Sequence, residues 1–592
     1  MGDKSYYTGL SYEGKYGPPI IMQGKLFYNL PLSNLGSNGG AICVDLRTGE
    51  EIWQKDIKLS LGQVYHYDSP NQHGAIPYLW QTGSTYKMFD PFTGELLLTL
   101  ENAVGRGTRT TMSPIGDMLV YVLDARNGWL AMWNSSYAQY NYPGTVGSSS
   151  WQWRPPIGTT QDWSEGIQWN VTIPDDIPST RAGIACIGEG VLVAAAQADD
   201  NTITAVGYST TTGAQKWATN ITSNVPNRPT YFIVPVGNGV FTFFRQETME
   251  FYAYSIETGE LVWGPTEPYS NDWGIFTSST AGLGASNPLI AYNTLYSVAY
   301  DGMIHAFNVS TGDGLWEFWT GSSGFETPYG TYPLGSGTFA IADGKVYAAT
   351  GEHSPNSPMW RGGRIYAVNA YTGQGVWNLT GWWQNPAVAD GYLTAFNNYD
   401  SQLYCIGKGL TETTVTSSEA VQTLGTPVLI KGTVTDQSPG DTCLGIPAAG
   451  TPAIADEYMT EWMEYMYMQQ EKPEDAEGVE VVITALDPNG NTYELGRTTS
   501  DANGNFGCVV EPSIAGKYKI IATFEGSKSY FSSTSTTYLW IEEAPSPTQP
   551  IEPEPTEPTE APLISTEIAM ILAVVVVAVI GVAAYWVLRK RK

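Results

Sequence analysis

The sequence is poor in charged side chains, and most of those it has are acidic. Charged residues make up 15% of the chain, compared with roughly 25% in an average soluble domain. Only 29 lysines and arginines stand against 58 aspartates and glutamates, which gives a formal net charge of −29. Because phosphate backbones are bound by clustered basic residues, the composition argues against a nucleic-acid partner.

Cysteine and catalytic motifs are also scarce. Five cysteines are too few for a disulfide scaffold, and without a Cys-x-x-Cys pair a zinc ribbon or thioredoxin-like site is not expected. Cys443 and Cys508 lie in one C-terminal region and are a candidate disulfide if that region is outside the cell. The P-loop, G-x-S-x-G and H-E-x-x-H motifs are missing as well, so no catalytic residue is assigned.

Helical periodicity is rare, whereas glycine and aromatic residues are abundant. The chain has 64 Gly, 37 Tyr and 20 Trp, a composition that suits short strands joined by tight turns. We therefore expect an all-β fold. The 592 residues exceed one compact domain, since domains average about 150 residues.

One pattern repeats six times in the first 410 residues. A small or apolar residue is followed by Thr-Gly, and in five copies a Trp stands four residues after the Gly. Glycine tolerates positive φ, so Thr-Gly indicates a tight hairpin turn, and the Trp is expected to pack against the neighbouring sheet. A second hairpin upstream brings each unit to about four strands, which is one propeller blade. The repeat residues are Gly49, Trp53, Gly94, Gly213, Trp217, Gly259, Trp263, Gly312, Trp316, Gly373 and Trp377.

Two degenerate units, around Met132 and Cys405, raise the count to eight, with seven blades as the alternative. The last unit has no T-G-x-x-x-W segment and should therefore lack its outermost strand. Cys43 and Cys405 stand where other units have Ala, so both are expected to be small buried hydrophobic residues.

This pattern resembles the PQQ-like β-propeller repeat, in which an A-x-D-x-x-T-G-x-x-x-W hairpin ends each blade. The resemblance covers residues 18–409 and implies a PQQ-like propeller over residues 1–410. Quinoprotein dehydrogenases of this superfamily hold PQQ and Ca²⁺ with the help of two adjacent cysteines and a Gly-Asn-x-x-Pro-Trp-like loop. Here there is no Cys-Cys pair, and the nearest loop has Glu352 and His353 in the Asn region. We therefore expect no cofactor, neither PQQ nor Ca²⁺, and no enzyme.

Two loops remain candidates for a metal site. One contains His66, Asp68 and His73, and the other contains Glu352 and His353. Equivalent blade loops gather near a propeller axis, so these side chains would converge in the funnel. The alternative is that they cap turns and satisfy buried backbone groups.

The propeller region also contains five Asn-x-Ser/Thr sequons, which are candidate glycosylation sites on a protein outside the cell. They are at Asn134, Asn170, Asn220, Asn308 and Asn378.

After a Thr/Ser-rich connector at residues 411–424, strand-like segments and DPNGN and DANGN turns predict a β-sandwich at residues 425–541. The stretch at 498–530 resembles the Ig-like repeats of bacterial and archaeal surface proteins. Inside this domain, residues 456–470 have Met and Trp at helical spacing. We expect an amphipathic helix that lies on the sandwich, with Asp456 as its N-cap; Cu(I) binding by its methionines is the alternative.

The C-terminal end predicts a membrane anchor. Residues 542–562 are rich in Pro, Glu and Thr and should form an extended stalk. Residues 568–588 are uncharged and apolar, and at 1.5 Å per residue they span ~30 Å of hydrocarbon. The basic tail at 589–592 is expected in the cytoplasm, so the rest lies outside. Because the first residues have no apolar signal, we expect that a native N-terminus with a signal peptide is missing.

Together these features predict a membrane-anchored cell-surface propeller that binds protein or glycan partners without catalysis. The plan resembles archaeal cell-surface proteins with PQQ-like repeats and a C-terminal anchor. One alternative is a surface oxidoreductase that uses PQQ or a metal in the funnel. The other is an envelope assembly factor, like the outer-membrane assembly lipoprotein with the same repeat, although that protein is held by an N-terminal lipid.

Overall fold

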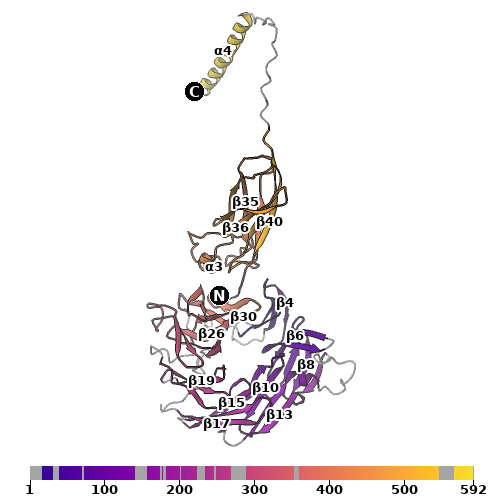
Figure 1. Ribbon diagram of the computed structural model, residues 1–592, viewed down its shortest axis with the longest axis vertical. Coiled ribbons are helices and arrows are strands. Elements are labelled where there is room, and N and C mark those ends of the chain that lie inside the picture. Colours follow the sequence, from indigo (N-terminus) through magenta and orange to yellow (C-terminus); the bar gives the residue numbers. More distant parts are fainter. Residues whose placement is uncertain are drawn as a thin grey trace.

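The computed structural model places a ring of sheets, a second β domain and a C-terminal helix in chain order (Figure 1). It describes residues 17–30, 39–69, 72–140, 157–173, 177, 182–199, 202–222, 234–245, 248–268, 288–352, 359–545 and 566–590. Strands dominate both domains, so the prediction of an all-β fold is confirmed.

The ring consists of eight antiparallel sheets in the described residues, and each contains one of the predicted units. The first four sheets are β1 (Ile20–Met22), β2 (Lys25–Leu30), β3 (Gly40–Asp45) and β4 (Glu51–Lys55); β5 (Leu61–Ser69), β6 (Gln72–Gln81), β7 (Tyr86–Phe89) and β8 (Leu96–Glu101), with β12 (Thr159–Asp162) parallel to β8; β9 (Thr108–Met112), β10 (Met118–Asp124), β11 (Trp129–Asn134) and β13 (Ile167–Thr172); and β14 (Gly183–Gly188), β15 (Val191–Asp199), β16 (Thr202–Ser209) and β17 (Gln215–Thr222).

The next three sheets have four strands each, and the eighth has three within the described residues. They are β18 (Val236–Gly237), β19 (Val240–Arg245), β20 (Glu250–Ser255) and β21 (Leu261–Trp263); β22 (Leu289–Ala291), β23 (Thr294–Val298), β24 (Met303–Asn308) and β25 (Gly314–Trp319); β26 (Leu334–Ala342), β27 (Lys345–Thr350), β28 (Arg364–Asn369) and β29 (Gly375–Thr380); and β30 (Trp383–Ala389), β31 (Tyr392–Asn397) and β32 (Gln402–Ile406).

The first and eighth sheets meet and close the ring. Innermost strands of neighbouring sheets lie side by side, including β1 with β5, β14 with β18, β18 with β22 and β26 with β30, and β30 also contacts β1. The Gly24 amide donates to Asp390 Oδ2 at 2.7 Å across this junction. A hydrophobic cluster that joins Leu26 and Val44 to Tyr392 and Leu403 fills the space between the two sheets.

The repeat Trp is the joint between one sheet and the next. Trp263 Nε1 donates to the Val309 carbonyl of the following sheet at 2.8 Å. Its ring lies against Gly312, where φ is +80° and a Cβ would come within 2.5 Å of the ring. A residue with a side chain would therefore be strained there and would also clash. The same donation to the next turn is made from Trp53 to Pro91, from Trp217 to Ile256 and from Trp316 to Ala370.

The two cysteines at the small-residue position differ. Cys43 is fully buried opposite Trp53 on the outermost strand of its sheet, as expected. Cys405, by contrast, is exposed, so the prediction that it is buried is wrong. Within the described residues the eighth sheet ends at β32, so no fourth strand with a Trp covers this side chain.

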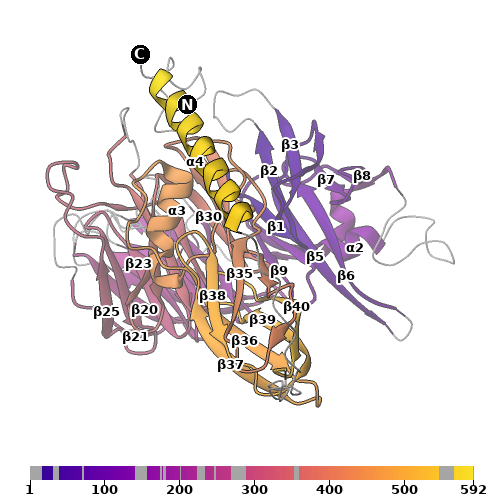
Figure 2. The same cartoon turned by 90° about the horizontal axis from the view of Figure 1, so that it is seen from above.

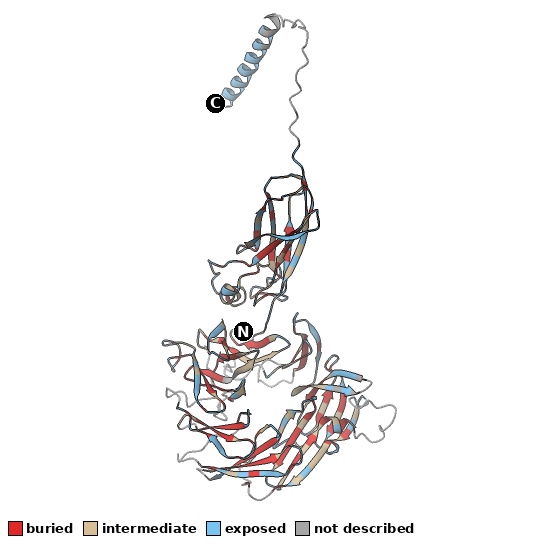
Figure 3. Ribbon diagram, in the orientation of Figure 1, coloured by how far each residue is buried: buried red, intermediate tan, exposed pale blue. Residues whose placement is uncertain are grey.

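The second domain is a sandwich of two sheets around one core. One sheet contains β33 (Thr411–Thr416), β35 (Val428–Asp436) and β38 (Asn505–Val510). The other contains β34 (Gln422–Thr423), β40 (Ser533–Glu542), β39 (Gly516–Phe524), β36 (Glu480–Leu486) and β37 (Thr492–Thr499). Buried residues of both sheets, among them Ile430, Phe506 and Ile520, form the core (Figure 3). The prediction that residues 411–424 only connect the two domains is corrected, because they contribute β33 and β34 to the sandwich.

The predicted helix at 456–470 is present as a 3-10 turn η3 (Asp456–Tyr458) and a helix α3 (Met459–Met468). Asp456 is not an N-cap of either element; its carboxylate accepts from the backbone amides of Lys528 and Ser529, both at 3.0 Å. The prediction that Asp456 is the N-cap is therefore wrong, because this tertiary contact holds its carboxylate away from the start of the helix. The propeller adds a short helix α2 (Ser135–Tyr140) and a 3-10 turn η1 (Trp163–Gly166).

The chain ends in a helix, α4 (Thr566–Arg589), drawn in yellow in Figure 2. Side chains at 566–569 and at 572 lie outside the described residues. In the part of the chain whose side chains are described, no helix is long and apolar enough to cross a membrane. Residues 546–565, most of the predicted stalk, are also outside the described ranges.

Candidate functional site

The sandwich is bonded to the propeller through α3, which faces the ring (Figures 1 and 2). Glu464 Oε1 accepts from the Thr380 amide at 2.9 Å, from Thr380 Oγ1 at 2.6 Å and from Arg364 Nη1 at 2.9 Å. The Glu464 side chain is only 11% exposed, so the carboxylate is largely removed from water. Arg364 Nη1 also donates to Asn378 Oδ1. A buried carboxylate with three donors is a specific joint, since each donor would otherwise be left unsatisfied.

The apolar side of α3 extends this joint to the eighth propeller sheet. Met463 and Met468 belong to the hydrophobic cluster that contains Trp377 and Tyr404. Tyr404 Oη donates to the Tyr467 carbonyl at 3.3 Å. The helix lies against residues of the sandwich, as expected, but part of its apolar surface also packs against sheets seven and eight.

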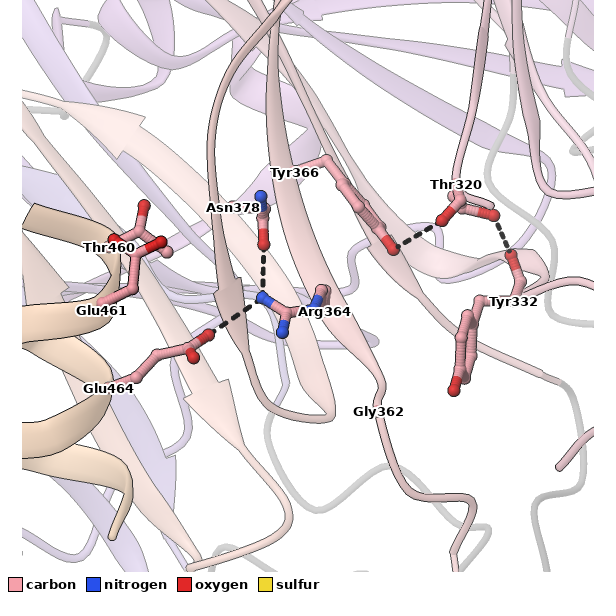
Figure 4. A pocket seen from close by; sticks show the side chains of 9 residues that line it. All are labelled: Thr320, Tyr332, Gly362, Arg364, Tyr366, Asn378, Thr460, Glu461 and Glu464. Atoms are coloured by element: carbon pink, nitrogen blue, oxygen red, sulfur yellow. Dashed lines mark hydrogen bonds and ion pairs between the residues drawn. The ribbon is translucent and has the colours of Figure 1, made fainter. Parts of the chain in front are cut away.

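A pocket of about 520 Å³ lies where α3 meets the seventh sheet (Figure 4). Two contacts hold one wall: Thr320 Oγ1 donates to the Tyr332 carbonyl at 2.9 Å, and Tyr366 Oη donates to the Thr320 carbonyl at 3.4 Å. Burial raises the pKa of Tyr366 to about 12, so this hydroxyl stays protonated at physiological pH. The pocket is lined by Thr320, Tyr332, Gly362, Arg364, Tyr366, Asn378, Thr460, Glu461 and Glu464.

The loop Thr320–Tyr332, whose two ends line this pocket, is braced by buried hydroxyls. Thr327 Oγ1 donates to the Thr331 carbonyl at 2.6 Å and lies 2.9 Å from Ser323 Oγ. All three side chains are buried. The loop nevertheless presents Phe325 fully exposed at its tip.

An ion pair fixes the residue next to this phenylalanine. Glu326 Oε1 accepts from the Arg361 amide at 2.7 Å, and Glu326 Oε2 accepts from Arg361 Nη2 at 3.0 Å. The Arg361 side chain is largely exposed, so this pair contributes orientation more than stability. The loop is linked to the pocket through Thr320 and Tyr332, and the ion pair is linked to it through Gly362, which follows Arg361. We refer to the loop, the ion pair and the pocket as the loop–pocket site.

Four of the five predicted metal residues are among those the structure describes. His73 Nδ1 lies 2.6 Å from Asp68 Oδ1 on the β5–β6 hairpin, with both side chains highly exposed, and His66 is exposed on β5. Glu352 is half-buried next to Tyr329 in the seventh sheet's loop, and burial together with this carboxylate raises the pKa of Tyr329 to about 12. His353 lies outside the described residues. Within the described ranges, no group of three or more His, Cys, Asp or Glu could hold a metal ion.

The predicted disulfide is absent from the structure, where Cys443 and Cys508 are both free. The reason is their placement: the Cys443 amide donates to the Met466 carbonyl of α3, whereas Cys508 lies on β38 beside Gly496. Among the sequons, Asn170 and Asn220 are exposed on outermost strands. Hydrogen bonds are accepted by Asn220 from Thr204, by Asn134 from Ser136, by Asn308 from Ser310 and by Asn378 from Arg364.

Sequence reasoning missed a buried ionic network in the sixth sheet. His305 Nε2 lies 3.0 Å from Asp301 Oδ2, and its Nδ1 lies 2.9 Å from Glu317 Oε1. Burial alone would lower the pKa of His305, but the hydrogen bonds to the two carboxylates outweigh it and raise the pKa above its ordinary value. Sequence reasoning also missed Arg364, Glu464 and Phe325, for which no motif gives a signal.

Comparison with known proteins supports the repeat assignment. A family model described as outer membrane protein assembly factor BamB, of the PQQ-repeat type, matches residues 232–438, from just before sheet five into the sandwich. No curated protein sequence matches the chain.

Solved structures with similar shape include the computationally designed Ika8 protein, with 12% identity, a TM-score of 0.40 and coverage of 66% of this chain and 95% of that one. BamB from Moraxella catarrhalis has 13% identity, a TM-score of 0.29 and coverage of 69% and 97%. The assignment comes from the repeat pattern and the family model. On these grounds the chain is a PQQ-like repeat β-propeller protein.

Proposed function

We propose that this protein is a membrane-anchored, non-enzymatic binding scaffold whose eight-bladed propeller docks a partner outside the cell through the loop–pocket site. The observation that carries the proposal is the loop Thr320–Tyr332. Its hydroxyls are buried and bonded, while Phe325 is fully exposed at the tip. A large aromatic side chain on a preorganised loop binds with little loss of conformational entropy, as interface hot spots do.

The joint at Glu464 supports the same function. It ties the propeller to the sandwich, which we take to be Ig-like, so that the loop–pocket site keeps a fixed orientation. The Pro-rich segment at 542–562 would act as the stalk. The uncharged run Ile568–Leu588 within α4, followed by four basic residues, would be the anchor with a cytoplasmic tail.

The test is residue-specific photo-crosslinking in intact cells that make the protein. A photoreactive amino acid replaces Phe325 in one version and Tyr371, an exposed aromatic on the blade-seven turn, in the control. We expect a defined covalent product from position 325 that is absent at position 371. No product at 325, or equal products at both positions, would refute the proposal. A membrane-impermeant label on the propeller tests its location separately.

A second function, an envelope assembly factor, is favoured by the family model that matches residues 232–438. Under this alternative the crosslinked partner would be part of the machinery that inserts outer-membrane proteins. Loss of the protein would then lower the amounts of those proteins, whereas a scaffold that binds a surface partner would leave them unchanged.

A further inference from the structure

The pocket of the loop–pocket site is lined mainly by groups that both donate and accept hydrogen bonds. Thr320, Thr460, Tyr332 and Tyr366 supply hydroxyls, and Asn378 supplies an amide. Such groups match the hydroxyls of a sugar, which also donate and accept. The two tyrosine rings add apolar faces, which suit the C–H face of a pyranose.

The charges around the pocket disfavour an anionic ligand. Arg364 and Glu464 form an ion pair at 2.9 Å, so their charges largely compensate each other. Glu461 also lines the pocket and leaves it with an excess of negative charge. A phosphate or carboxylate would be repelled, and a wholly apolar ligand would leave the hydroxyl and amide groups of the walls without partners.

The shape of the pocket depends on a glycine. Gly362 has a φ of +80°, and a Cβ at this position would lie 2.4 Å from the Tyr332 hydroxyl. The absence of a side chain therefore leaves room for this hydroxyl at the pocket wall. The volume of about 520 Å³ falls within the range typical of small-molecule sites.

We propose that this pocket binds a neutral mono- or disaccharide unit. This inference rests on the proposed function, since the sugar would belong to the partner that the Phe325 loop contacts. Arg364 and Glu464 hold the walls together, while Tyr332 and Glu461 are the groups free to bind the sugar.

The test measures binding of free sugars to the full-length protein, purified in a detergent without a sugar headgroup. Isothermal titration uses a panel of neutral disaccharides, with glucuronic acid and glucosamine as charged comparisons. The pocket variants are Tyr332→Phe and Glu461→Gln, and the matched control is Tyr371→Phe, outside the pocket. We expect a neutral disaccharide to bind, with a Kd raised about fivefold by Y332F and about tenfold by E461Q, and unchanged by Y371F.

Three results would overturn the inference: no binding by any neutral sugar, stronger binding of glucuronic acid or glucosamine than of neutral sugars, or binding that the pocket variants leave unchanged. The crosslinking experiment fails or succeeds separately. A crosslink at position 325 without sugar binding would refute only the saccharide inference. Sugar binding without the crosslink would refute the partner-docking function and leave a sugar site.

Discussion

The joint between propeller and sandwich can be weakened by a single isosteric change, Glu464→Gln. The carboxylate accepts from Thr380 through both its amide and its hydroxyl and from Arg364, with distances of 2.6–2.9 Å. Glutamine keeps the size of the side chain but removes the charge, and its amide group can turn a donor toward these donors. The two domains should therefore separate more often in the variant, while each keeps its own core.

The size of the effect follows from the exposure of the partners. Hydrogen bonds to a charged group are worth about 1.5–3 kcal/mol each, compared with about 0.5–1.5 kcal/mol for neutral ones. The Arg364 side chain is 34% exposed, so its share of the interaction is partly screened by water. We expect a loss of about 2 kcal/mol in the free energy of domain opening, which corresponds to about a 30-fold increase in the open population.

Amide hydrogen exchange reads this opening directly, because the Thr380 amide is protected by Glu464 itself. Peptides that contain Thr380 should exchange about 30-fold faster in E464Q, whereas peptides from β36 in the sandwich core should not change. Glu461→Gln is the control, since Glu461 is on the same helix and accepts no described hydrogen bond from the propeller. Unchanged exchange at Thr380, or an equal effect of E461Q, would show that the carboxylate does not hold the domains together.

Gly312→Ala should destabilise the propeller by about 2–4 kcal/mol in denaturant unfolding, because its Cβ would meet a Trp ring, while Gly314→Ala, with open space around it, should cost less than about 1 kcal/mol. His305→Gln should flatten the pH dependence of stability above about pH 6.5: the folded pKa of His305 is raised, so its contribution is complete below about pH 6.5 and is lost as the pH rises through the folded pKa; an unchanged profile would exclude this role. The pKa of Glu317 is lowered, so its contribution should be lost on acidification through the folded pKa, and Glu317→Gln should remove this loss in acid unfolding. Met463→Ala in the sandwich helix should speed hydrogen exchange in β31 and β32 of the propeller, because the free energy of local opening there falls by about 1–2 kcal/mol. Unchanged exchange in these strands would show that α3 does not stabilise the eighth sheet.

The propeller was predictable because its repeat residues are also its joints. Thr-Gly predicts the turn since glycine takes the positive φ that Gly259 and Gly312 show. The Trp four residues later predicts contact with the next sheet, and Trp217 and Trp263 both donate to its backbone. The same short pattern therefore predicts both the hairpin turn and the contact with the next sheet.

The loop–pocket site was not predictable because its members depend on partners far away in sequence. Glu464 reads as a solvent-facing charge on an amphipathic helix, and its burial is favourable because Arg364, 100 residues earlier, and Thr380, 84 residues earlier, donate to it. Phe325 has no motif around it, since the hydroxyls that brace its loop are ordinary Ser and Thr. The segment TETTVT read as a connector because of its threonines, but β-branched Thr also favours strands, and β33 pairs with β35.

The helix α3 explains how the last propeller sheet is completed and why the two domains act as one unit. In sheets one, four, five and six the repeat Trp donates to the turn of the next sheet, but Trp377 of sheet seven precedes a sheet without a Thr-Gly turn. Met463 and Met468 of the sandwich join its cluster instead, while Glu464 on the same helix bonds to the seventh sheet. One helix therefore covers the end of the repeat series and fixes the sandwich in place. Any force that pulls the sandwich away from the ring must also expose apolar surface of the propeller, which opposes movement between the domains.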